Sequence, residues 1–192
     1  MTGAKEGPEL ARMAGEARGY SDRAAALGIE LADLPDGQHP RVMVAACSDA
    51  RLVPGLITGS RPGEILELRT QGGLVPRFDP ELPTGEALTI EYAVASLPIT
   101  DIVVLGHSHC EVVDIDVADT LDADTGQDIW TTGDFTGAGH SHVLRQLDVL
   151  SDYACIAPRV ADGSLRLHAW YHELATGATL RFRPDVSAFL PL

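Results

Sequence analysis

Two apolar runs interrupt the otherwise mixed pattern of hydrophobic and polar positions along the chain. Residues 41–46 and residues 101–106 are almost continuous stretches of valine, alanine, isoleucine, leucine and methionine. Strands that are buried on both faces of a parallel sheet read in this way. A further strand is expected over residues 64–68, and residues 85–97 show helical periodicity. The order strand, helix, strand predicts a right-handed parallel crossover.

The two ends of the chain show different patterns. Alanine-rich periodicity predicts a helix over residues 6–33 with a break near Gly28, and turn residues at 34–37 close this segment. Near the carboxyl end, residues 165–172 and 179–183 flank a turn and read as an antiparallel hairpin. The other expected elements are a helical stretch from Cys47 to Leu56, a largely buried helix over residues 85–97 that uses Leu88 and Tyr92 on one face and Ile90 and Val94 on another, a loop over residues 111–139, and helices over residues 142–151 and 155–161.

These elements predict an α/β fold for the 192-residue chain. We expect a mostly parallel central sheet flanked by helices, with an antiparallel carboxyl-terminal hairpin or edge strand. Residues 1–37 are interpreted as an amino-terminal helical arm and residues 38–192 as a single α/β domain. A chain of this length is large enough to bury about 70% of its unfolded surface.

Charge and cysteine content narrow the class of protein. The formal net charge of −14 argues against nucleic acid or an anionic membrane as a partner. The apolar runs are too short to cross a bilayer, and the first fifteen residues lack the apolar core of an export signal. Three cysteines do not make a disulfide framework, and metal-bound thiolates suit a reducing compartment. We therefore expect a cytoplasmic protein.

Candidate metal ligands follow the two apolar runs directly. Cys47 begins the string CSDAR, and His107 and Cys110 belong to the string HSHC. Parallel strands bring their carboxyl ends to one edge of the sheet, where open α/β folds place their sites. Two thiolates and one imidazole suit zinc, and three protein ligands leave a fourth position open for catalysis. The alternative is that these residues are two ordinary core cysteines and a loop histidine.

These strings and their surroundings resemble the β-class carbonic anhydrases. The family pairs a Cys-x-Asp-x-Arg string with a Gly-His-x-x-Cys string, which here read CSDAR and GHSHC. Weaker similarities lie at residues 62–64, 90–94 and 167–170. The resemblance extends from about Gln38 to the carboxyl terminus. It implies a zinc lyase, a carbonate dehydratase that converts carbon dioxide and water reversibly to bicarbonate.

The resemblance also implies roles for particular residues. Zinc-bound hydroxide would be the nucleophile, and Asp49, paired with Arg51, would orient it. In some members the aspartate ligates the metal instead, so Asp49 is also a candidate fourth ligand. Gln38 matches a glutamine that binds substrate oxygen. The family further implies a homodimer or homotetramer, in which the amino-terminal arm packs on a partner subunit.

Two departures from the family pattern leave other functions open. Glu111 replaces the usual glycine after the last ligand, where it adds bulk and negative charge beside the bound substrate or product. Thr70 replaces an asparagine after Arg69. A hydrolase of carbonyl sulfide or carbon disulfide on the same fold, or a catalytically silent zinc-stabilised scaffold, are the alternatives. His140 and His142 have the spacing of a second metal pair, but no nearby third ligand is visible in the sequence.

Overall fold

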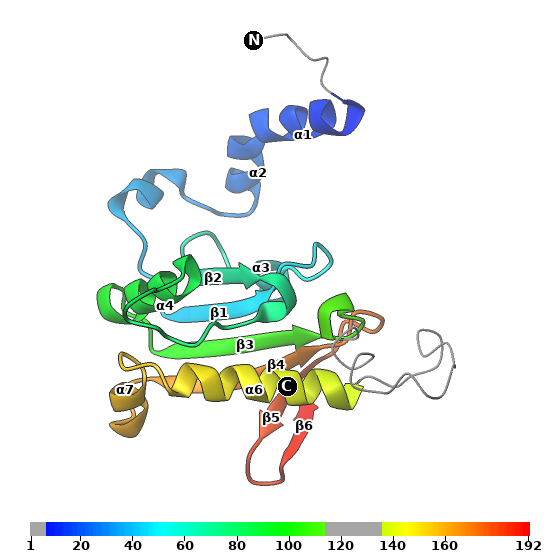
Figure 1. Ribbon diagram of the computed structural model, residues 1–192. Helices are drawn as coiled ribbons and strands as arrows, with labels where there is room; N and C mark the ends of the chain where they lie inside the picture. Colours follow the sequence, from blue (N-terminus) through cyan, green and yellow to red (C-terminus); the bar gives the residue numbers. More distant parts are fainter. Residues whose placement is uncertain (1–6, 114–135) are drawn as a thin grey trace.

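A computed structural model describes residues 7–113 and 136–192 of the chain (Figure 1). Its centre is a six-stranded sheet in the order β2-β1-β3-β4-β5-β6. The first four strands of that order run parallel, and β5 and β6 are added antiparallel. The strands are β1 (Val42–Cys47), β2 (Ile65–Thr70), β3 (Asp101–His107), β4 (Arg166–His172), β5 (Thr179–Arg183) and β6 (Ala188–Pro191). This confirms the predicted fold class, although β6 was not predicted.

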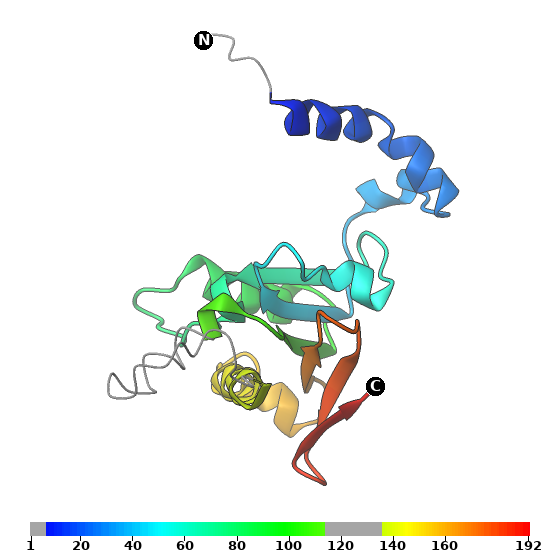
Figure 2. The same cartoon turned by 90° about the vertical axis from the view of Figure 1, so that its right-hand side faces the viewer.

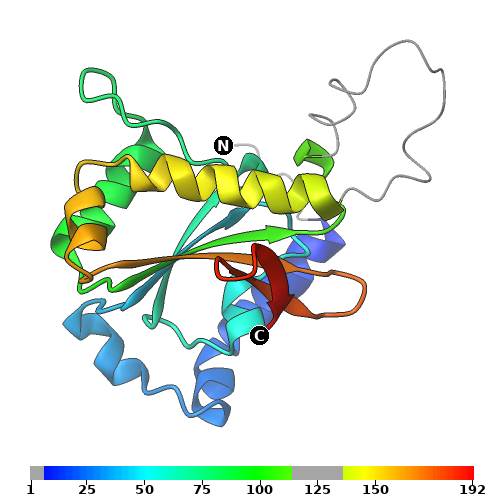
Figure 3. The same ribbon diagram turned by 90° about the horizontal axis from the view of Figure 1, so that it is seen from below.

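Helices cover both faces of the parallel part of the sheet. Helices α4 (Gly85–Ser96) and α6 (Thr136–Ser151) lie on one face, and the short α3 (Pro54–Thr58) lies on the other (Figure 3). Side chains alternate between the faces along each strand. In β3, Ile102 and Val104 pack with α4 and α6, whereas Val103 and Leu105 pack with the α3 side. Both sets are buried, which explains why the strand sequences are apolar throughout.

The amino-terminal arm extends away from the sheet (Figures 1 and 2). It consists of α1 (Pro8–Arg18), α2 (Tyr20–Ala26) and a 3-10 helix, η1 (Leu31–Asp36). The predicted break near Gly28 is present, and a second break at Gly19 separates α1 from α2. No residue of α1 is buried. None of the helices in the described part of the chain is long and apolar enough to span a bilayer.

Several predicted elements differ in extent or orientation from those observed. Helix α4 is buried on one face only, because Leu88 is 50% and Tyr92 is 48% exposed. Helix α3 begins at Pro54 and not directly after Cys47. The loop predicted over residues 111–139 is wrong at both ends, because residues 111–113 are helical and α6 begins at Thr136. Residues 114–135 of that loop lie outside the described residues. The last helix is α7 (Ala157–Ala161), and a 3-10 turn, η2 (Gln71–Gly73), follows β2.

Candidate metal centre and substrate pocket

Three potential ligand atoms converge at the carboxyl end of the sheet. Cys47 is the last residue of β1, and His107 is the last residue of the adjacent parallel strand β3. Cys110 follows after a two-residue turn. The Sγ atoms of Cys47 and Cys110 are 4.0 Å apart, and the ligand atoms of all three residues lie within 4.8 Å of one another. Among the described residues, these three form the group of His, Cys, Asp and Glu side chains that could hold a metal ion.

The histidine is prepared to act as a ligand. Its Nδ1 lies 2.9 Å from the Ser108 carbonyl oxygen, so Nδ1 carries the proton and Nε2 presents its lone pair. The buried Nε2 has no hydrogen-bond partner among the described residues. A buried unpaired nitrogen is costly unless a metal or another partner binds it. Fixing the tautomer through the second ring nitrogen is the usual arrangement for a metal-binding histidine.

The two cysteine sulfurs lie within hydrogen-bonding distance of each other. Their mutual hydrogen bond lowers the pKa of Cys47 and raises that of Cys110. The backbone N–H of Asp49 also donates to the Cys47 sulfur, at 3.4 Å. A divalent metal would bind both sulfurs as thiolates and displace any remaining thiol proton. The donor set thus fits zinc, which accepts two thiolates and one imidazole.

Asp49 and Arg51 form a close ion pair beside this cluster. The Arg51 Nε donates to Oδ1 at 3.0 Å and its terminal nitrogen donates to Oδ2 at 2.6 Å. The Arg51 backbone N–H donates to Oδ1 as well, at 2.8 Å. The hydrogen bonds from the Arg51 side chain hold the pKa of Asp49 well below its usual range. Oδ2 lies 4.0 Å from the His107 Nε2, so the carboxylate faces the ligand cluster while Arg51 holds it.

Arg69, near the end of β2, fixes the backbone that carries this ion pair. Its Nε donates to the Cys47 carbonyl at 2.8 Å, and one terminal nitrogen donates to the carbonyls of Asp49 at 3.0 Å and Leu52 at 2.6 Å. The role of Arg69 was not predicted from the sequence. The available signal was its place at the end of the strand neighbouring β1, which puts its long side chain beside the ligand loop.

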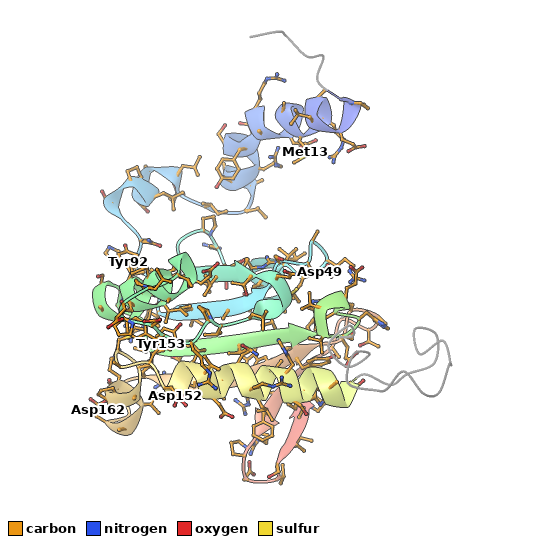
Figure 4. All side chains as sticks on the ribbon, in the orientation of Figure 1. Met13, Asp49, Tyr92, Asp152, Tyr153 and Asp162 are labelled. Atoms are coloured by element: carbon orange, nitrogen blue, oxygen red, sulfur yellow. The ribbon has the colours of Figure 1, made fainter. Side chains whose placement is uncertain are left out.

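A pocket of about 220 Å³ opens beside the cluster. Glu111, an exposed residue, lies on its wall, and so does the η2 turn. Figure 4 shows Asp49 at this edge of the sheet. Gly73 allows the turn to approach closely, because its φ is 69° and an added β-carbon would lie 3.2 Å from the Cys47 nitrogen. The pocket is lined by Cys47, Ser48, Asp49, Gln71, Gly72, Cys110, Glu111 and Val112.

The remaining predicted site residues lie apart from this pocket. Gln38 is exposed and precedes β1, whose opposite end carries Cys47. Six strand residues span about 20 Å, so the structure does not bring Gln38 to the cluster of its own chain. His140 and His142 lie on α6, where the His142 Nε2 is 2.9 Å from the Gly72 carbonyl oxygen.

Two cysteine sulfurs and an imidazole converge at the carboxyl edge of an α/β sheet, an arrangement that is suited to a metal ion. The sequence model of the carbonic anhydrase family matches residues 42–133. A carbonic anhydrase of Pseudomonas aeruginosa is 33% identical over 162 residues, 73% of this chain and 72% of the relative. Carbonic anhydrase 1 of Escherichia coli O157:H7 is 30% identical over 81% of this chain and 79% of the relative.

Solved structures of β-carbonic anhydrases share the fold of this chain. The β-carbonic anhydrase CcaA superposes with a TM-score of 0.81 at 25% identity and covers 97% of this chain and 93% of its own. One of two tetrameric β-carbonic anhydrases of Sordaria macrospora superposes with a TM-score of 0.72 at 22% identity, over 92% and 97% of the two chains. The chain belongs to the β-class carbonic anhydrase family, whose members are lyases that hydrate carbon dioxide.

Proposed function

We propose that this chain hydrates carbon dioxide reversibly to bicarbonate at a zinc ion held by Cys47, His107 and Cys110. The observation that carries the proposal is the convergence of the three ligand atoms within 4.8 Å, with the Asp49 carboxylate 4.0 Å from the His107 Nε2. A bound zinc ion would activate water as a nucleophile near neutral pH. The protein would supply the orientation of that water and a pocket of suitable size.

Asp49 would orient the attacking water by accepting a hydrogen bond. Its carboxylate stays ionised because Arg51 donates to both of its oxygens, so it can only accept. This hydrogen bond would fix the direction in which the lone pair of the water points. Correct orientation of the nucleophile lowers the reaction barrier. Arg51 also donates to the His109 carbonyl at 3.0 Å and so joins the two ligand loops. Asp49 is paired with Arg51 in this arrangement. To act as a fourth metal ligand, its predicted alternative role, Asp49 would have to break that ion pair.

Glu111 would weaken the retention of the anionic product. It lines the pocket, and its charge is near enough to contribute to the raised pKa of Arg51, although the hydrogen bond to Asp49 is the main cause. A carboxylate at this wall repels bicarbonate. We therefore propose that Glu111 acts on product release and affinity, not on activation of water.

The assembly we propose is a homodimer or homotetramer in the cytoplasm. The Sordaria macrospora protein described as tetrameric shares the fold, and residues 7–37 of the arm expose apolar side chains that the sheet does not cover. Gln38 lies at the wrong end of β1 to serve its own site. Its predicted contact with substrate therefore requires a site on another subunit. Free thiols as ligands fit a reducing compartment.

Stopped-flow measurement of carbon dioxide hydration, made on protein with measured zinc content, tests this function. We expect hydration by the zinc-loaded protein and its loss when a chelator removes the metal. Parallel assays for sulfide release from carbonyl sulfide and carbon disulfide separate the alternative hydrolase. If zinc-loaded protein hydrates nothing, Glu111→Gly is the diagnostic variant. Recovery there would identify Glu111 as the silencing change, and no recovery would favour the scaffold.

A further inference from the structure

The segment that follows β2, residues 71–76, forms one wall of the substrate pocket, and we call it the strap. Gln71 and Gly72 of the strap line the pocket together with the ligand Cys47. The strap contains no charged side chain and few regular backbone hydrogen bonds, since η2 covers only Gln71–Gly73. Something outside the strap must therefore determine its position.

Side chains from one helix and its carboxyl-terminal extension hold the strap backbone. The His142 Nε2 lies 2.9 Å from the Gly72 carbonyl oxygen and donates its proton to it. The Val75 N–H donates to the Gln146 Oε1 at 3.0 Å. His142 is only 5% exposed and Gln146 only 4%. The two residues are one helical turn apart, so both point from the same face of α6 toward the strap.

Helix α6 is itself seated firmly on the sheet beside the metal ligands. Gly106 immediately precedes His107 in β3, and a β-carbon at this glycine would overlap the Val143 side chain of α6. Val143 is buried in the same core as Val104 of β3. The donor on His142 and the acceptor on Gln146 are therefore fixed relative to β3, and through them the strap is fixed relative to the ligand cluster.

We infer that His142 and Gln146 are positioning residues for the reaction, which hold the Gly72 wall of the pocket at its distance from the metal centre. The inference rests on the proposed hydration function. Removing the His142 donor would leave a buried carbonyl without that partner, and the strap would shift to find another. A shift of about 1 Å in an active-site wall costs up to about a hundredfold in rate.

Tyr153 provides a matched control for this inference. Its hydroxyl donates to the Pro76 carbonyl at 2.6 Å, so it also holds the strap by one side-chain hydrogen bond. Pro76, however, does not line the pocket beside Cys47. Tyr153→Phe and His142→Leu should therefore lower the melting temperature comparably, and only His142→Leu should disturb the site. His142→Gln keeps an N–H donor at the position of Nε2 and serves as the conservative rescue.

The experiment measures kcat/KM for carbon dioxide, zinc content and melting temperature for these three variants and Gln146→Leu. We expect His142→Leu to lose about tenfold or more in kcat/KM with full zinc content, and Gln146→Leu to lose less because Val75 is three residues from Gly72. His142→Gln and Tyr153→Phe should stay within about twofold of the parent. Loss that simply follows melting temperature, equal for Tyr153→Phe and His142→Leu, would overturn the inference.

A second readout does not depend on hydration. Protein loaded with cobalt(II) in place of zinc would carry a coloured probe, whose visible absorption would change when iodide binds the metal. We expect His142→Leu to change the iodide affinity severalfold and Tyr153→Phe to leave it unchanged. If the parent hydrates nothing, the proposed function fails but this comparison still decides the positioning role. Equal iodide affinity in the parent and His142→Leu would show that the strap does not depend on His142.

Discussion

Asp49 owes its chemical state to a neighbour only two residues along the chain. The Arg51 side chain donates to both carboxylate oxygens, and its backbone N–H donates to one of them. Charge-assisted bonds of this kind keep a carboxylate ionised and limit its rotation. Because Arg69 fixes the Asp49 carbonyl as well, the carboxylate is held from both its backbone and its side chain.

Replacing Asp49 by asparagine should therefore affect the reaction more than the metal. The asparagine amide has one oxygen and one NH2 group, so it can accept from Arg51 at only one terminal atom and donates at the other. Its orientation should therefore differ from that of the carboxylate. We expect Asp49→Asn to retain one zinc per chain and to lose about a hundredfold in hydration rate. Zinc analysis and stopped-flow kinetics on the same sample test this. A variant as fast as the parent at every pH would refute the proposed orienting role.

Cys110 should behave in the opposite way, because its sulfur is one of the three converging ligand atoms. We expect Cys110→Ala to lose its zinc on dialysis against a moderate chelator, since two ligands bind zinc far more weakly than three. Cys155→Ala is the control, because Cys155 is half-buried and lies outside the cluster. Elemental analysis should find zinc in the control only. Full zinc occupancy in Cys110→Ala would remove Cys110 from the ligand set.

At this scale the sequence could predict the ligand cluster but not its supports. Cys47 and His107 each end an apolar run, and parallel pairing brings such ends together. Arg69 has only its place near the end of β2 as a signal, and His142 has none. Each donates to backbone carbonyls that are distant in the sequence. Every residue has a backbone carbonyl, so the sequence does not show which one accepts the hydrogen bond. Gln38 precedes β1 and Cys47 ends it, so chain order alone places these two residues at opposite ends of the strand.

Strands β3 and β4 are joined at their amino ends by one carboxylate. Asp101 accepts from the Arg166 Nε at 2.7 Å and from its terminal nitrogen at 2.6 Å. The His168 Nε2 lies 2.9 Å from the same carboxylate. Arg166 is opposite Asp101 in the strand register, so the ion pair helps to fix that register. The Arg166 hydrogen bonds lower the pKa of Asp101 well below its usual range.

A carboxylate whose pKa is depressed in the folded protein stabilises the fold at pH values above its pKa in the unfolded chain, about 3.9 for an aspartate. This stabilisation is lost as the pH falls through the pKa of the folded protein. We expect Asp101→Asn to lower the free energy of unfolding by about 1 to 2 kcal/mol at pH 7, a figure reduced because water reaches Arg166. The difference from the parent should shrink as pH falls below about 4. Urea unfolding of both proteins at neutral and acid pH measures it. A difference that is constant with pH would contradict the assignment.

The sequence predicts strands well where both faces of the strand are buried, because such a strand reads as a continuous apolar run. Strands β1 and β3 are such cases. The sequence predicts a largely buried α4 because Leu88 and Tyr92 offer large hydrophobic surfaces on one face and Ile90 on another, yet the sheet covers only the Ile90 side. Figure 4 shows Tyr92 on the outer part of α4. An apolar side chain does not reveal whether its own chain or another molecule will cover it.

At the scale of the whole molecule, the amino-terminal arm also exposes apolar side chains that its own chain does not cover. In α1, Leu10 is 56% and Met13 is 58% exposed, and Figure 4 shows Met13 on the projecting helix, away from the sheet. The two residues are three apart and so share one helix face. A short helix with no buried residue has little to stabilise it in water by itself. A second copy of the chain would supply the missing apolar surface.

We therefore expect the parent to be a dimer or a larger symmetric assembly at micromolar concentration, and Leu10→Ser/Met13→Ser to shift it toward smaller species. The matched control is Glu9→Ser/Arg12→Ser on the same helix. It removes an exposed ion pair of 3.3 Å, which is worth less than about 1 kcal/mol, and leaves the apolar face intact. Light scattering should show the control assembled like the parent. A monomeric parent, or equal assembly of both variants, would mean that the arm does not join the subunits, and the predicted role of Gln38 at a partner's site would lose its support.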